Sequence, residues 1–185
     1  MKTLKSIVAA TDFSEEARHG VDRAALIAKE QQARLELLHV ISRSSLDALD
    51  NVFRAPADVE AKLVDDARST LNELIADIGG KTSVVASPCI KIGRVLDEVL
   101  SASESADLLV LGSHGLNPLR DRILGTTAER LLRTCKRPVL VTKRPPQALY
   151  EHVIVPVDFS PYSAPALAMA KEIAPNARIT IIHAF

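Results

Sequence analysis

The sequence predicts an α/β protein built on a parallel sheet of five strands. Short apolar runs alternate along the chain with longer segments in which apolar residues recur at helical spacing. Of the 185 residues, 47% are hydrophobic, and the many Ala, Val, Leu and Ile residues are typical of strands buried on both faces. Such alternation implies right-handed crossovers, with helices on both faces of the sheet.

Local patterns place the individual elements. Ser14 is expected to be the N-cap of the first helix, because Glu15 and Glu16 favour the positive first turn. Gly79-Gly80 is expected to end the long second helix. Pro138 opens the last strand, which indicates an edge position. The expected order is a strand at 6–10, a helix after Ser14, a strand at 35–40, a helix at 57–78, a strand from 83, a short helix around 95–100, a strand at 107–111, a helix at 128–134 and a strand at 138–142.

The opening pattern recurs near the end of the sequence. Residues 152–160 echo residues 6–14, including the triplet Asp-Phe-Ser, and residues 179–184 match the second strand together with its histidine. A β-α-β unit of this size cannot bury both faces of its own strands, so we expect it to pack on the first domain, a second chain or further residues. The expected division is a complete domain at 1–144, a linker at 145–149 and a partial second repeat at 150–185.

A glycine-rich segment follows the fourth strand. Gly112-Ser113-His114-Gly115 comes directly after an apolar run, and Gly125-Thr126 follows after nine intervening residues and leads into the last helix. Glycines let backbone N–H groups approach phosphate oxygens, and a helix N-terminus adds partial positive charge. The spacing predicts a phosphate-binding loop, with a plain turn before a capped helix as the alternative. Thr126 and Glu129 also fit a capping box, which can share this turn with a phosphate site.

Asp12 ends the first strand. If the first and fourth strands are neighbours, Asp12 lies beside Gly112 where the strand order reverses, and open parallel sheets bind ligands at that point. A carboxylate there suits a ribose hydroxyl pair or an adenine edge, with a turn or capping role as the alternative. His114 either touches phosphate or shapes the loop. Arg120 and Arg122 are expected on a solvated surface, with phosphate contact as the alternative.

Several chemistries lack their sequence signature. The chain has no P-loop lysine motif, no GxGxxG after the first strand and no His/Cys/Asp cluster at metal-ligand spacing. Ser113 and His114 with Asp12 invite a hydrolase triad, but adjacent residues in an extended segment project oppositely. The sequence therefore nominates no catalytic residue and no metal ligand.

The composition of the chain indicates which classes of binding partner and which cellular compartment to expect. Lys+Arg and Asp+Glu number 23 each and aromatic residues are 3%, so neither a basic field nor a stacking platform for nucleic acid is expected. Cys89 and Cys135 form no CxxC motif and suit a reducing cytosol. No apolar run reaches the length of a membrane helix. We expect a soluble cytoplasmic protein that binds neither nucleic acid nor membrane.

These motifs resemble the nucleotide-binding branch of the universal stress protein family. The resemblance covers residues 3–143 and rests on Val8–Ser14, Leu38–Val40, Val110–Gly115, Gly125-Thr126 and Arg137–Val141. It implies a Rossmann-like fold, similar to the adenine nucleotide α-hydrolases, with strand order 3-2-1-4-5. It also implies a homo-oligomer through the edge strand Pro138–Thr142. Because the second copy keeps Asp158 but has no glycine loop, the chain resembles a tandem protein whose second domain is shortened.

The resemblance also implies a nucleotide site. The backbone around Ala10 and Val40 would hold adenine, Asp12 would contact the nucleoside, and the glycine segments would cradle the phosphates. The expected cofactor is ATP, with any Mg²⁺ held through its phosphates and water. The expected nucleotide-binding residues are Ala10, Thr11, Asp12, Val40, Gly112, Ser113, His114, Gly115, Gly125, Thr126 and Thr127.

The leading hypothesis is an ATP-binding protein of stress response or signalling, with at most slow ATP hydrolysis. Two alternatives remain at this stage. One is an ATP-pyrophosphatase or nucleotidyl-transfer enzyme, on fold analogy. The other is an interaction scaffold that works without nucleotide.

Overall fold

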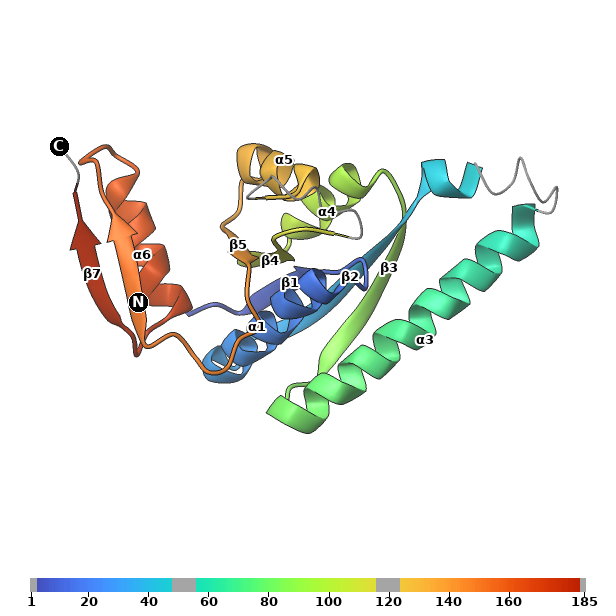
Figure 1. The fold of residues 1–185 in the computed structure, drawn as a ribbon, viewed down its shortest axis with the longest axis horizontal. Coiled ribbons are helices and arrows are strands. Elements are labelled where there is room, and N and C mark those ends of the chain that lie inside the picture. Colours follow the sequence, from blue (N-terminus) through green and yellow to red (C-terminus); the bar gives the residue numbers. More distant parts are fainter. Residues whose placement is uncertain (1–2, 48–55, 116–123, 184–185) are drawn as a thin grey trace.

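Five parallel strands form the central sheet, in the order β3-β2-β1-β4-β5, in a computed structural model that describes residues 3–47, 56–115 and 124–183 (Figure 1). This confirms the predicted fold class and strand order. The elements up to the end of this sheet are β1(Ser6–Ala10), α1(Glu15–Gln31), β2(Arg34–Ser42), α3(Pro56–Thr82), β3(Ala86–Gly93), α4(Val95–Ser103), β4(Leu108–Gly112), α5(Thr126–Thr134) and β5(Val139–Thr142).

Helices cover both faces of the sheet, because alternate residues of each buried strand point to opposite sides. Ile7 and Ala9 of β1 join the core beneath α1 and α3, whereas Val8 joins the core beneath α4 and α5. Ser14 caps α1 as predicted, its Oγ accepting from the Ala17 amide at 3.2 Å. β5 lies at the edge of the sheet, also as predicted.

Helix α3 does not end at Gly79-Gly80, which corrects the expectation from sequence. The helix runs through both glycines to Thr82, and Ser83 leaves it with a left-handed φ of 63°. The Ser83 amide donates to the Gly79 carbonyl at 2.8 Å. The helix therefore ends about one helical turn later than expected. Strand β3 consequently begins at Ala86 rather than at Ser83.

Helix α1 and strand β4 touch backbone to backbone. A Cβ on Gly20 would lie 2.8 Å from the carbonyl carbon of Leu111 and 2.9 Å from the amide nitrogen of Gly112. A Cβ on Gly112 would in turn lie 2.6 Å from the carbonyl carbon of Glu16 and 2.7 Å from the amide nitrogen of Ala17. Side chains at these two positions would therefore push the helix off the strand.

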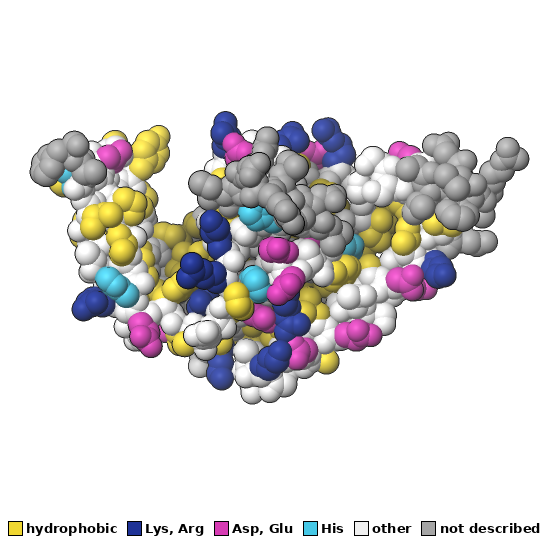
Figure 2. All heavy atoms as spheres, viewed as in Figure 1, with side chains coloured by type: hydrophobic (Ala, Val, Ile, Leu, Met, Phe, Trp, Pro, Cys, Tyr) yellow, Lys and Arg dark blue, Asp and Glu magenta, His cyan; other side chains and the backbone are white. Residues whose placement is uncertain are grey.

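The C-terminal unit is a separate parallel pair with one helix, made of β6(His152–Pro156), α6(Ser163–Ile173) and β7(Arg178–Ile182). Its strands stay largely uncovered: Ile154, Ile181 and Ile182 are exposed, and Figure 2 shows hydrophobic side chains at the surface of this unit.

The C-terminal unit packs on helix α1. Arg23 of α1 is only 8% exposed; its guanidinium lies 4.0 Å from the ring centroid of Tyr150, and its Nη1 donates to the Ala148 carbonyl at 2.7 Å. Two further hydrogen bonds join the same helix to the unit, from Gln31 Nε2 to the Glu172 carbonyl and from Asn176 Nδ2 to Glu30 Oε1. The neighbour that the unit contacts in this structure is thus helix α1 of the five-stranded domain.

Candidate functional site

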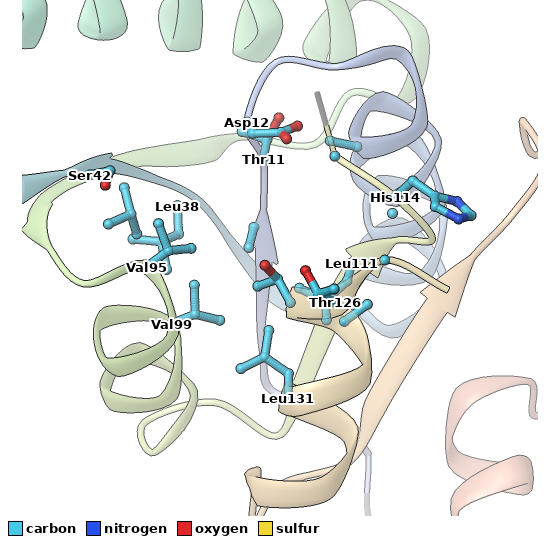
Figure 3. A pocket seen from close by; sticks show the side chains of 18 residues that line it. Thr11, Asp12, Leu38, Ser42, Val95, Val99, Leu111, His114, Thr126 and Leu131 are labelled. Atoms are coloured by element: carbon cyan, nitrogen blue, oxygen red, sulfur yellow. The ribbon is translucent and has the colours of Figure 1, made fainter. Parts of the chain in front are cut away.

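A cavity of about 450 Å³ opens at the carboxyl edge of the sheet, between the ends of β1, β2 and β4 and the helices α4 and α5 (Figure 3). Every nucleotide-binding residue predicted from the sequence lines it, with the exception of Ser113. The lining residues are Ala10, Thr11, Asp12, Ala17, Leu38, Val40, Ser42, Val95, Val99, Leu111, Gly112, His114, Gly115, Gly125, Thr126, Thr127, Ala128 and Leu131.

Pairing of β1 with β4 places Asp12 beside the glycine segment, as the sequence suggested. Asp12 Oδ1 accepts from the Ser14 amide at 3.1 Å and from the Ser14 hydroxyl at 2.6 Å. The other carboxylate oxygen faces Gly115 so closely that a Cβ on Gly115 would overlap it. Gly115 is thus required by close approach to the Asp12 side chain.

Close approach also explains the other glycines of the site. We expected them because glycine lets backbone N–H groups approach a ligand closely. Among the described residues, no glycine has a positive φ. A Cβ on Gly125 would lie 3.3 Å from the Cα of His114, which leaves little room for any larger residue.

The N-terminus of α5 faces the cavity without a side-chain cap. Its N-cap is Gly125, with no side-chain hydrogen bond, and Thr126 is already the first helical residue. The predicted capping box is therefore wrong, because Thr126 does not occupy the N-cap position. Glu129 instead accepts from Arg133 Nη2 at 2.7 Å. The amide groups of the first turn are the donors that a bound anion would find there.

Ser113 does not line the cavity and instead holds neighbouring segments together. It is 3% exposed; its amide donates to the Thr142 carbonyl at 3.0 Å, and its carbonyl accepts from the Gly125 amide at 2.7 Å. It therefore ties the two glycine segments and β5 together. His114 Nδ1 lies 3.2 Å from Ser113 Oγ, so the two side chains do meet, contrary to the expected opposite projection. Burial of Ser113 nevertheless keeps its hydroxyl away from any substrate in the cavity.

An apolar wall completes the cavity, and sequence reasoning missed most of it. Leu38 comes from β2, and Val95 and Val99 come from the first turns of α4; Figure 3 shows these three gathered at one end, away from His114. Because α4 starts just after the carboxyl end of β3, its first turns must lie at this edge of the sheet. That topological signal was available in the sequence once the strand order was known.

Charged groups around the cavity are few within the described residues. No lysine or arginine belongs to the described lining. Arg120 and Arg122, considered above as phosphate contacts, lie outside the described residues. In the described part of the chain, His, Cys, Asp and Glu side chains nowhere gather in threes as metal ligands would. Nor does any described helix combine the length and hydropathy needed to cross a bilayer.

Comparison with known proteins identifies the family and supports the fold. The model of the universal stress protein family matches residues 3–143. The chain belongs to this family. Universal stress protein A homolog 1 of Coxiella burnetii is 33% identical over 140 residues, which cover 74% of this chain and 94% of that protein.

Solved universal stress proteins share the architecture. A universal stress protein from Archaeoglobus fulgidus DSM 4304 superposes with a TM-score of 0.78 at 24% identity, covering 96% of this chain and 66% of its own. A universal stress protein solved in complex with cAMP superposes with a TM-score of 0.56 at 21% identity, covering 77% of this chain and 98% of its own. At these identities the likeness establishes the fold.

Proposed function

We propose that this universal stress protein binds an adenine nucleotide, ATP, in the cavity at the carboxyl edge of its sheet. The observation that carries the proposal is one juxtaposition: the Asp12 carboxylate, the glycine segments and the uncapped α5 N-terminus all line the same cavity, next to an apolar wall. A flat base fits an aliphatic wall, a ribose suits a carboxylate, and phosphates suit backbone amides. The cAMP complex of a universal stress protein is consistent with this ligand class.

The residues present divide naturally among the parts of the ligand. The backbone around Ala10 and Val40 would hold the base, and the Asp12 carboxylate would accept hydrogen bonds from the ribose. The amides of the α5 first turn, beginning at Thr126, would bind the phosphates, with Mg²⁺ held through the phosphates and water. One complete site per chain is expected.

Binding, rather than rapid turnover, is the proposed role. Phosphoryl transfer relies on positioned cations and an oriented nucleophile. The described lining includes neither a lysine nor an arginine, and Ser113 is buried. We therefore infer a stress-response or signalling protein with slow ATP hydrolysis at most. The free thiols Cys89 and Cys135 favour a reducing compartment, so the proposal places the protein in the cytoplasm.

Replacing Asp12 by alanine tests the site directly. Calorimetric titration of the wild-type chain with ATP should give a stoichiometry approaching one, and Asp12→Ala should weaken the affinity about tenfold or more, since a hydrogen bond to a charged group is lost. Asp158→Ala is the matched control, because Asp158 holds the equivalent position in the second Asp-Phe-Ser triplet and does not line the cavity. A wild-type chain without affinity for ATP, or equal loss in both variants, would contradict the proposal.

The free edge of β5 is the proposed route to a homo-oligomer through Pro138–Thr142. The carbonyls of Pro138 and Thr142 accept from β4, so by the period of two the Val141 amide faces outward. Val141→Pro removes this outward donor without a loss in the ladder to β4. Sedimentation should show wild-type dimers and Val141→Pro monomers with unchanged thermal stability. A monomeric wild type at micromolar concentration would rule this assembly out.

A further inference from the structure

The turn that carries Asp12 has an uncommon backbone shape. Phe13 has a left-handed φ of 67°, a backbone conformation that is strained for a bulky residue and must be held by its surroundings. The Phe13 amide donates to the Thr11 hydroxyl at 3.0 Å. Ser14 binds the Asp12 carboxylate from the other side. The direction of Asp12 therefore depends on how Thr11 and Phe13 are anchored.

His39 of β2 anchors both residues. Its Nδ1 lies 2.9 Å from the Thr11 carbonyl, and its ring stacks on the Phe13 ring with centroids 4.2 Å apart and planes at 23°. A carbonyl can only accept, so Nδ1 carries the proton that it donates. The Thr11 amide donates to the Leu38 carbonyl at 2.9 Å. Thr11 is thus held to β2 at both of its backbone groups, one residue beyond the last register pair, Ala10 with Leu38.

Burial favours the neutral form of the His39 ring. It lowers the pKa of His39 below its ordinary value, although the hydrogen bond to Thr11 and the charge of Asp12 act in the opposite direction. The neutral ring therefore has a fixed tautomer, with Nδ1 protonated and used at the Thr11 carbonyl.

A similar arrangement forms in the C-terminal unit, although its two ring planes are tilted at 53° rather than stacked. Phe159 has a φ of 58°, and its ring centroid lies 4.6 Å from that of His183. His183 Nδ1 lies 2.7 Å from the Val157 carbonyl, and Asp158 Oδ1 accepts from the Ser160 amide at 2.9 Å. Between residues 150 and 183, the part of this unit that the structure describes, there is neither a glycine segment nor a counterpart of α5. The histidine–carbonyl–phenylalanine contact thus accompanies the Asp-Phe-Ser turn even where the phosphate-binding half is missing.

We propose that His39 is a positioning residue of the nucleotide site: by holding the Thr11 carbonyl and the Phe13 ring, it fixes the direction in which Asp12 meets the ligand. The inference rests on the proposed nucleotide site and names a residue that does not line the cavity. His39 would act on affinity only through Asp12.

Two substitutions separate the donor from the ring. His39→Phe keeps a ring against Phe13 and removes the donor, whereas His39→Asn keeps a donor near the position of Nδ1 and removes the ring. Calorimetric titration with ATP should show His39→Phe weakened about tenfold, because the contact between Asp12 and the ligand is misdirected. His39→Asn should recover most of the affinity. His183→Phe is the matched control and should bind ATP like the wild type.

A double-mutant cycle shows whether His39 acts through Asp12. In the Asp12→Ala background, His39→Phe should cause no further loss of affinity. Wild-type affinity in His39→Phe, no recovery in His39→Asn, or an undiminished loss in the Asp12→Ala background would each overturn the role of His39 while the nucleotide site stands. Absence of ATP binding by the wild-type chain would instead remove the proposed function itself.

Discussion

Replacing Gly115 by valine is expected to weaken ATP binding by about 100-fold or more while leaving the fold intact. A Cβ at this position would overlap the Asp12 carboxylate. Asp12 cannot simply turn away, because its other oxygen is held by both the amide and the hydroxyl of Ser14. The substituted side chain therefore displaces the carboxylate from the cavity, and its two methyl groups enter the space of the ligand.

Titration calorimetry, together with thermal unfolding, checks this expectation. Gly115→Ala should lie between the wild type and Gly115→Val in affinity, because alanine adds the overlap with Asp12 without the further methyl groups. The unfolding midpoints of the three proteins should agree closely, since the overlap involves a partly exposed side chain at the cavity and not the hydrophobic core. Equal affinity of Gly115→Val and wild type would show that the nucleotide is not bound at this cavity.

Replacing Gly20 by alanine is expected to lower the free energy of unfolding by about 2 kcal/mol. This is the opposite of the usual effect, since alanine normally stabilises a helix relative to glycine. Alanine in a helix interior is ordinarily more stable than glycine by up to about 1 kcal/mol. At Gly20, however, the added methyl group would stand 2.8 Å from the backbone of Leu111, and backbone atoms of a central strand cannot move aside. The helix must shift outward, and the core beneath it loses contacts.

Gly80 supplies the matched control for this measurement. It also lies inside a helix, α3, but a Cβ there would meet nothing within 4 Å. Urea unfolding should therefore show Gly80→Ala more stable than the wild type and Gly20→Ala less stable. Two variants that change stability in the same direction would contradict the close contact of α1 with β4.

Much of the fold followed from local patterns in the sequence. Alternating apolar runs predicted the strands, Ser14 was correctly identified as the N-cap of α1, and Pro138 marked the edge strand. The strand order, which came with the family resemblance, placed Asp12 beside Gly112. The juxtaposition of these two residues depends on which strands pair, and no local pattern encodes pairing.

The errors share a physical cause, in that tertiary contacts overrode local preferences. Gly79-Gly80 remains helical because the packed helix α3 outweighs the weak helix propensity of glycine. Thr126 fits a capping box by spacing, yet the tie between the Gly125 amide and the Ser113 carbonyl shifts the N-cap to Gly125. Ser113 lies within the glycine segment and was therefore predicted to be a site residue, but contacts to distant segments bury it. None of these contacts is visible within a short window of sequence.

The backbone contact between α1 and β4 also determines how the cavity can deform. The Asp12 turn leads directly into α1, and Gly112 ends β4, so the interlocked Gly20 and Gly112 join these two walls into one body. Relative motion of Asp12 and Gly112 would require the helix to lift off the strand. Any widening of the cavity to admit a ligand must therefore come from the helices opposite, α4 and α5. The wall that carries Asp12 and Gly112 is therefore the rigid side of the cavity.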